Sequence, residues 1–120
     1  MASDTVNRCT FIGRLGRDVE IVGEGKSRRA VFSLATESGY KDKETEEWKT
    51  TTDWIRVVTW LPWKIEYLEK HGKKGAGIYV EARAKTRSEE IDGKKYQLTD
   101  FVVEQDGAVI ITNYAEAGGE

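Results

Sequence analysis

The sequence is poor in the residue types on which most catalytic and metal sites depend. It contains one cysteine, one histidine and one proline. Cys9 has no second cysteine with which to form an internal disulfide, and neither Cys9 nor His71 belongs to a metal-ligand pattern such as C-x-x-C or H-x-x-H. We therefore expect no enzyme activity, no metal and no cofactor, and a reducing cellular compartment.

Long apolar runs are also missing. No segment approaches the roughly 20 apolar residues needed to cross a membrane, and the first residues, MASDTVNR, lack the apolar core of a secretion signal. We expect a soluble, intracellular protein with no membrane partner. A chain of 120 residues can bury the core of one domain but has no room for a second folded unit.

Positive charge is absent from the last part of the chain. All 19 Lys and Arg residues lie at or before Lys95 with 16 acidic residues, which gives +3, whereas residues 96–120 hold five acidic residues and no basic one, which gives −5. A formal net charge of −2 disfavours strong unspecific affinity for duplex DNA, which depends on dense phosphate neutralisation. Nucleic-acid binding by this chain would depend more on base stacking.

The alternation of apolar and polar residues predicts strands with one short helix. The expected elements are strands at 5–15, 29–36, 51–60, 77–87 and 96–105, short extended pieces at 19–22 and 108–112, and a helix that begins at Pro62 and ends at Gly72. Residues 23–27 and Asp92-Gly93 are expected to turn the chain. Residues 37–52 contain no Val, Ile, Leu, Met or Phe, so we expect a mobile loop there.

Three strands, a helix and two strands, in this order, are typical of the OB fold, a five-stranded Greek-key barrel that binds oligonucleotides and oligosaccharides. The predicted fold class is therefore all-β with one short helix. The barrel is expected to occupy residues 1–112, followed by a short flexible acidic end at residues 113–120.

The segment TTDWIRVVTW carries the clearest functional signal. On a strand, Trp54, Arg56 and Trp60 share one face, while Ile55 and Val57 take the other and can supply the core. Open aromatic rings with a guanidinium between them suit unstacked bases beside phosphates. The alternative is that both tryptophans pack under another strand or in a subunit interface.

A second strand repeats this division of faces. Between residues 77 and 87, Arg83, Lys85 and Arg87 fall on one face, and Val80 and Ala82 fall on the other. Two strands of the predicted barrel thus each offer a polar or aromatic outer face.

The chain resembles the bacterial single-stranded DNA-binding proteins in seven segments, which occur in the expected order: VNRCTFIGRLGRDVE, VFSLATES, YKDKETEEWK, TDWIRVV, EYL, YVEARAKTR and DGKKYQLTDFVVE. The resemblance runs from about Val6 to Val103 and is most specific at IGRLGRD and TDWIRVV. It implies an OB-fold homo-oligomer, usually a tetramer, that coats single-stranded DNA during replication, recombination and repair with little sequence preference. It also implies a cytoplasmic, nucleoid-associated protein, for which replication or repair proteins are further candidate partners.

The resemblance also suggests which residues contact DNA. It places Trp54 and Trp60 at base-stacking positions and Tyr40 at a further aromatic position in the long loop, whereas Trp48 could touch DNA or cover the barrel rim. The predicted DNA-binding residues are Trp54, Arg56, Trp60, Tyr40, Lys43, Trp48, Arg8, Arg83, Lys85 and Arg87.

Two departures from the family pattern leave a second interpretation open. SEEIDG follows Arg87 where the family usually has another tryptophan. The sequence ends at NYAEAGGE without the family's long tail, whose acidic, apolar tip recruits other replication proteins, so either the sequence is truncated or the protein recruits its partners differently. The alternative is a primosome-type accessory protein of the same fold, which acts mainly through protein contacts. The presence of Trp54, Arg56 and Trp60 favours DNA binding.

Overall fold

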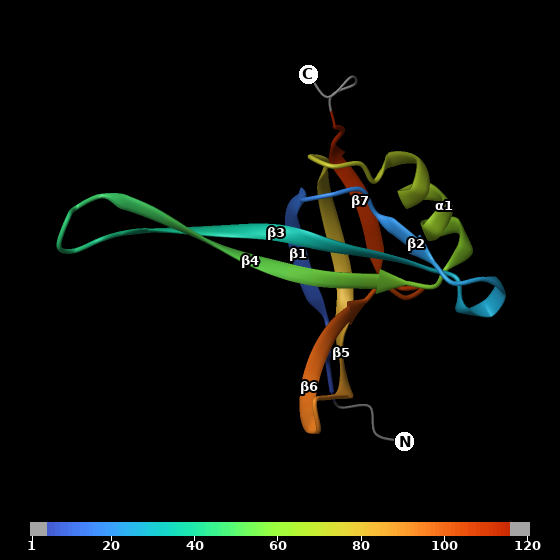
Figure 1. Cartoon of the computed structure of the whole chain (residues 1–120). Helices are drawn as coiled ribbons and strands as arrows, with labels where there is room; N and C mark the ends of the chain where they lie inside the picture. Colours follow the sequence, from blue (N-terminus) through green and yellow to red (C-terminus); the bar gives the residue numbers. More distant parts are fainter. Residues whose placement is uncertain (1–4, 116–120) are drawn as a thin grey trace.

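Strands account for most of residues 5–115, the part of the chain that the computed structural model describes (Figure 1). The strands are β1 (Cys9–Leu15), β2 (Glu20–Val22), β3 (Arg29–Lys41), β4 (Trp48–Thr59), β5 (Gly77–Ile91), β6 (Lys94–Val102) and β7 (Ala108–Asn113). The helix α1 spans Pro62–His71, and a 3-10 turn spans Gly25–Ser27. Each predicted strand and the predicted helix is present, with shifted ends.

Five of the strands close into a barrel. β1 pairs antiparallel with both β3 and β5, β3 pairs with β4, and β5 pairs with β6. The ring closes where β4 runs parallel to β6, with Val57 opposite Phe101 and Val58 opposite Val102. β2 adds to β3, and β7 adds to β5. The predicted OB-fold barrel is confirmed.

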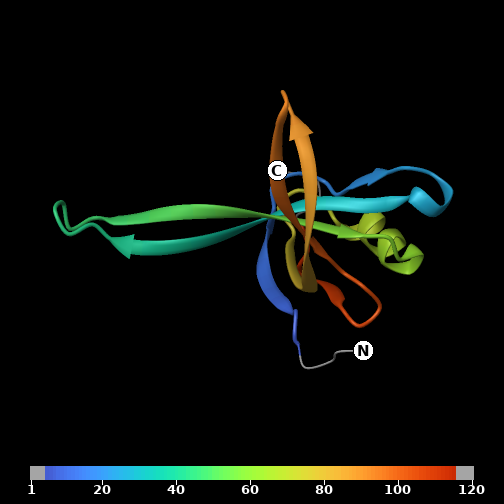
Figure 2. The ribbon, with the colours of Figure 1, turned by 90° about the horizontal axis from the view of Figure 1, so that it is seen from below.

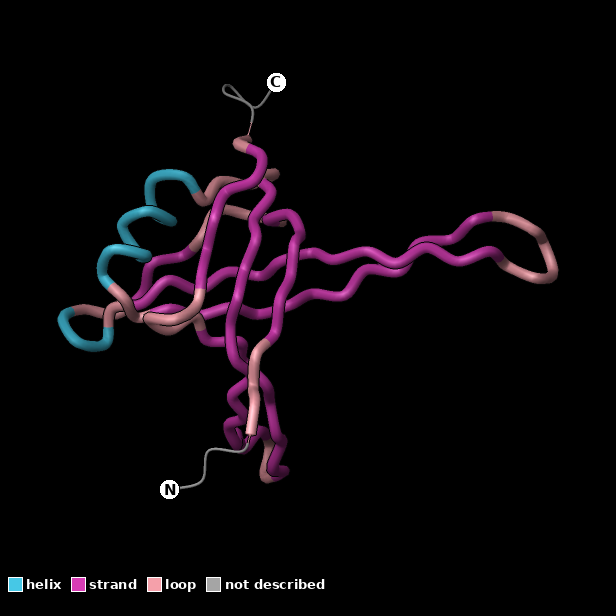
Figure 3. Tube along the Cα trace, turned by 180° about the vertical axis from the view of Figure 1, so that it is seen from behind, coloured by secondary structure: helices cyan, strands magenta, loops and turns pink. Residues whose placement is uncertain are grey.

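The alternation read from the sequence fills this barrel. Leu34, Val57, Ile78 and Val80 are fully buried, each on the inward face of its strand. Helix α1 packs on β2 and β3 at one end of the barrel (Figure 3), where it buries Ile65 and Leu68. Pro62 occupies its first turn, where a missing N–H costs nothing, and the N–H of Gly72 donates to the Leu68 carbonyl at its end.

Two hairpins leave the barrel, and the longer one contradicts the prediction of a mobile loop at residues 37–52. β3 and β4 stay paired as far as Lys41 opposite Trp48, so that only residues 42–47 form the turn. The ribbon projects far from the barrel (Figures 1 and 2). We call it the arm, residues 37–52.

The arm is ordered for reasons that do not show in the pattern of apolar residues. The pairing register of β3 and β4 continues without a break from the barrel into the arm. Each further residue pair therefore adds backbone hydrogen bonds to an existing hairpin, and no separate hairpin has to nucleate. Asp42 fastens the turn, because its Oδ1 accepts the N–H groups of Glu44 at 2.8 Å and Thr45 at 3.3 Å.

The remaining differences lie at element ends. β5 continues past the predicted end at residue 87 to Ile91, because it pairs with β6 up to the predicted turn at Asp92-Gly93, where both residues have positive φ. β1 begins at Cys9, later than predicted. Of the expected acidic end, Asn113 belongs to β7, and residues 116–120 lie outside the described part of the chain. Within residues 5–115, no helix is long and apolar enough to span a membrane.

Candidate nucleic-acid interface

The outer face of β4 and the residue after it present two open tryptophans. Trp54 is 56% exposed and Trp60 is 45% exposed, while Arg56 lies between them in the sequence and also points outward. Neither ring packs under another strand of the described chain, so that part of the alternative interpretation is wrong. Val58 has the same parity but is buried, because β6 pairs alongside it where the barrel closes.

Trp54 packs against Gly16, which lies in the connection between β1 and β2. A Cβ atom added to Gly16 would lie 2.8 Å from Cη2 of Trp54, so the edge of the indole occupies the space that any other residue would fill. Ala35, the cross-strand partner of Trp54 on β3, is also small. The ring is therefore supported at one edge while most of it remains open to solvent.

Trp60 borders a broad, shallow groove of about 610 Å³. The groove is lined by Trp60, Leu61, Lys85 and the residues from Val102 to Asp106. It therefore runs from the end of β4 across β5 to the segment that follows β6. Its two carboxylates, Glu104 and Asp106, are paired with Arg83 and Arg8. The aromatic ring and the ammonium group of Lys85 therefore suit a base and a phosphate of the same strand.

Arg56 and Arg87 are held together by one carboxylate. Asp100 on β6 is only 13% exposed in its side chain, and it accepts Nη1 of Arg56 at Oδ1 and Nε of Arg87 at Oδ2, both at 2.8 Å. Arg87 also donates to Glu89 at 2.7 Å. The hydrogen bonds to Glu89 and Asp100 raise the pKa of Arg87, so its guanidinium remains charged. Two predicted contacts from different strands thus form one basic group.

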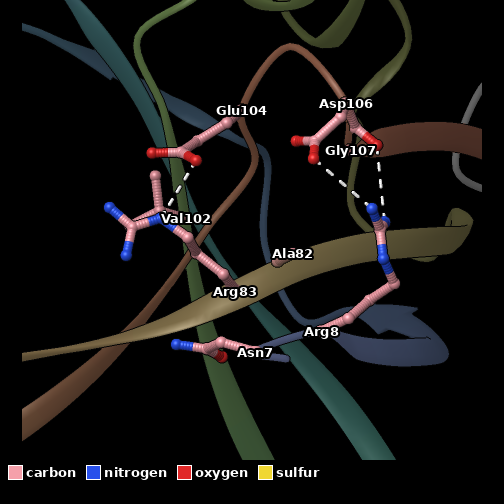
Figure 4. Close-up of a pocket in the computed structure, with 8 residues that line it drawn as sticks. All are labelled: Asn7, Arg8, Ala82, Arg83, Val102, Glu104, Asp106 and Gly107. Atoms are coloured by element: carbon pink, nitrogen blue, oxygen red, sulfur yellow. Dashed lines mark hydrogen bonds and ion pairs between the residues drawn. The ribbon is translucent and has the colours of Figure 1, made fainter. Parts of the chain in front are cut away.

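Arg8 and Arg83 also form ion pairs with carboxylates, and both line a small hollow of about 50 Å³ (Figure 4). Arg83 contacts Glu104 at 2.9 Å, and Arg8 contacts Asp106 at 3.4 Å and Glu81 at 3.3 Å. Every arginine predicted to contact phosphate is therefore matched by a carboxylate. Because the pairs of Arg8 and Arg83 are partly exposed, each is weak enough for a phosphate to compete for the arginine.

The arm separates two of the predicted aromatics. Trp48 has the parity of Trp54 along β4, and it lies opposite Lys41. Tyr40 lies opposite Lys49, on the other face of the ribbon. Trp48, which is 76% exposed, is thus the arm residue that continues the row of Trp54, whereas Tyr40 is on the reverse face of a twisting ribbon.

The lysines among the predicted residues are free to meet phosphate. Lys43 is exposed in the turn of the arm, and Lys85 is exposed on β5. Within residues 5–115, neither has an ion-pair partner, whereas Lys49 contacts Asp42 at 3.2 Å. The mixed charges of the arm are therefore partly neutralised within its own turn.

The sequence-based set leaves out two residues of this face, Arg17 and Ser33. A hollow of about 240 Å³ beside Trp54 is lined by Gly16, Arg17, Ser33 and Trp54. Ser33 is the cross-strand partner of Arg56, but Arg17 comes from the distant IGRLGRD turn. The only signal for Arg17 in the sequence is its place in that turn, and no spacing rule relates the turn to Trp54.

Comparison with known proteins agrees with this geometry. Residues 6–108 match the Single-strand binding protein family. The single-stranded DNA-binding proteins of Rickettsia felis and Rickettsia prowazekii are each 31% identical to the chain over 109 residues, which cover 89% of this chain and 72% of each relative.

Solved structures of similar proteins have the same fold. A Plasmodium falciparum SSB, solved in complex with ssDNA, is 30% identical and superposes with a TM-score of 0.78 over 94% of this chain and 100% of that chain. The mitochondrial single-stranded DNA-binding protein Rim1 of S. cerevisiae, 21% identical, shares the fold with a TM-score of 0.67, covering 90% of this chain and 96% of its own. The resemblance read from the sequence is confirmed, and the chain belongs to the single-strand binding protein family.

Proposed function

We propose that this protein binds single-stranded DNA, without catalysing a reaction, by stacking bases on Trp54 and Trp60 and holding the intervening phosphates on basic side chains. The observation that carries the proposal is that both rings stand open on the barrel surface on either side of Arg56 in the sequence. The relatives named single-stranded DNA-binding protein, and the related SSB solved with ssDNA, support the same assignment.

Stacking accounts for a preference for single strands. Each stacked base contributes about 1–3 kcal/mol by alanine substitution, and every base has a face that can stack. A duplex hides those faces in its own stack, so it gains only the phosphate contacts. The protein is therefore expected to bind many sequences alike and to discriminate strongly against duplex DNA.

The basic residues contribute in two ways. Lys43 and Lys85 can take phosphates directly, whereas Arg8, Arg56, Arg83 and Arg87 must share or exchange their carboxylate partners. Phosphate binding that replaces an existing ion pair gains less than binding to a free cation. Stacking is therefore the larger part of the affinity.

We propose further that the protein is a homo-oligomer and that this oligomer is a tetramer. Ile12, Tyr79 and Ile110 lie side by side across β1, β5 and β7, and the two isoleucines are 63% and 50% exposed. In the described part of the chain, the edge of β1 from Cys9 to Gly13 that faces away from β5 has no strand partner. An apolar face beside an open strand edge suits packing against a second copy.

The biological role that follows is the coating and protection of single-stranded DNA during replication, recombination and repair, in the cytoplasm at the nucleoid. The binding domain would run through β7, whose last residue is Asn113. Replication or repair proteins are candidate partners. We prefer this role to that of a primosome-type accessory protein, because the stacking rings are open in the folded chain.

A competition experiment with matched tryptophan variants tests the proposal. A labelled oligo-dT is bound to the protein and challenged with unlabelled single strand or with a duplex of equal charge. Trp54→Ala should weaken binding about 5- to 150-fold, as expected for the loss of one stacked base. Trp63→Ala, which removes an equally exposed ring (54%) from α1, should change it little. A folded Trp54→Ala protein that binds like the unaltered protein would contradict the proposal.

A further inference from the structure

Among the described residues, 5–115, Arg17 differs from every other arginine because it has no side-chain partner. Arg8, Arg28, Arg56, Arg83 and Arg87 form ion pairs, and Arg14 and Arg29 donate to the carbonyls of Gly75 and Ser27. Within residues 5–115, no side-chain hydrogen bond or ion pair involves Arg17, which is exposed. An arginine with all five donors free is ready for an external anion.

The turn that carries Arg17 is fixed on both sides. Before it, the N–H of Leu15 donates to Ala76 and the Leu15 carbonyl accepts from Gly75, both at 2.9 Å. After it, the N–H of Val19 donates to Gly72 at 2.8 Å, and the Asp18 carboxylate accepts the Lys74 N–H at 2.8 Å. Ordering this backbone therefore costs nothing further when a ligand binds.

The position of Arg17 determines what that ligand is. Arg17 lines the hollow beside Trp54 with Gly16 and Ser33, and it also lines a second hollow with Arg56. The first hollow has an aromatic face, a guanidinium and an exposed hydroxyl, and no carboxylate among its lining residues. The second also contains Asp18 and Glu20, which repel phosphate. A nucleotide is accommodated best in the first hollow.

Resting on the proposed function, we infer that Gly16, Arg17, Ser33 and Trp54 form one nucleotide subsite. The base stacks on Trp54, whose edge is supported at Gly16. The adjoining phosphate accepts hydrogen bonds from the Arg17 guanidinium and the Ser33 hydroxyl. Arg17 is thus a DNA contact in addition to those predicted from the sequence. Because it loses no carboxylate on binding, its contribution exceeds that of the paired arginines.

Salt dependence of binding tests this subsite. For single strands, each neutralised phosphate contributes about 0.7 to the slope of log Kobs against log salt concentration. Arg17→Ala should lower that slope by about 0.7 and the affinity for oligo-dT by about five- to tenfold at low salt. Lys26→Ala is the control, since Lys26 is exposed in the 3-10 turn and, in the same described range, also lacks an ion-pair partner. It should leave slope and affinity nearly unchanged.

The outcomes separate this inference from the proposed function. If the unaltered protein fails to bind oligo-dT, the proposed function itself is wrong. If the unaltered protein binds, and Arg17→Ala either matches it or loses no more than Lys26→Ala, the subsite is wrong and the proposed function stands. Arg17→Lys, which keeps the charge, should restore the slope while leaving affinity below that of the unaltered protein. Should the alanine variant not fold, Arg17→Gln replaces it, with the same expected loss of slope and affinity and the same contradicting result.

Discussion

Arg56 and Asp100 face each other where the barrel closes, with Nη1 of the guanidinium 2.8 Å from Oδ1 of the carboxylate. The same carboxylate holds Arg87 through its other oxygen. Asp100 therefore orients both arginines and at the same time neutralises part of the charge that DNA would meet.

Replacing this carboxylate tests which effect dominates. Asp100→Asn should raise the affinity for oligo-dT several-fold at low salt, because a negative charge that repels and competes with phosphates is removed. It should also lower the free energy of unfolding by about 1–2 kcal/mol, since two charged hydrogen bonds are weakened. Glu69→Gln, which breaks the exposed Arg28 pair, is the control for charge. A lower affinity in the Asp100→Asn protein would show that orientation dominates.

Thr59 makes a buried hydrogen bond between the end of β4 and the segment that follows β6. Its side chain is fully buried, and its hydroxyl donates to the Val103 carbonyl at 2.9 Å. Thr59→Val leaves that carbonyl without its donor and also removes the oxygen that accepts the Leu61 N–H at 3.4 Å. It should lower the free energy of unfolding by about 1–3 kcal/mol. Thr59→Ser keeps the hydroxyl but loses a buried methyl group, for about 1 kcal/mol. Urea denaturation measures both; a valine variant as stable as the unaltered protein would mean that this bond contributes no net stability.

The contact between Gly16 and Trp54 gives a prediction for binding. Gly16→Val places carbon atoms where the indole edge lies, so Trp54 must turn away. Single-strand affinity should fall toward that of Trp54→Ala, with a shift in tryptophan emission. Gly39→Ala is the control, because its added Cβ meets only the Lys49 carbonyl, at 3.8 Å. Unchanged affinity in Gly16→Val would mean that the position of the ring does not matter.

The turn of the arm should loosen in acid. Hydrogen bonds from the Glu44 N–H, the Lys49 side chain and the Thr45 N–H lower the pKa of Asp42 below its ordinary 3.8. A carboxyl with a lowered folded pKa stabilises the turn above the ordinary value, and this contribution is lost as the pH falls through the lowered pKa. NMR of the Glu44 and Thr45 amides should therefore report loss of the turn below pH 3.8, and Asp42→Ala should show that loss at every pH. Amides that stay unchanged until the barrel unfolds would contradict this.

The parts of the molecule that follow from local chemistry were predictable. Period-two alternation identifies the strands that bury Val57 and Val80, and Pro62 and Gly72 mark the ends of the helix. The open faces of Trp54 and Trp60 follow from the same parity. Each of these features depends on residues close together in the sequence.

The parts that depend on distant pairing were not predictable. The arm at residues 37–52 has no apolar pattern, because both of its faces are exposed, so its order arises from register with the barrel. The same register determines that Tyr40 lies on the reverse face from Trp48. Carboxylates such as Asp100 meet their arginines only after the strands have assembled, as Arg17 meets Trp54.

Tryptophan fluorescence during titration with oligo-dT, with a duplex of equal charge as the comparison, tests the central claim most directly. Trp48→Phe and Trp63→Phe together leave Trp54 and Trp60 as the only indoles, so any change reports on the stacking positions. Strong quenching by the single strand with little response to the duplex is the predicted result. No quenching by the single strand, or an equal response to both, would contradict base stacking on Trp54 and Trp60.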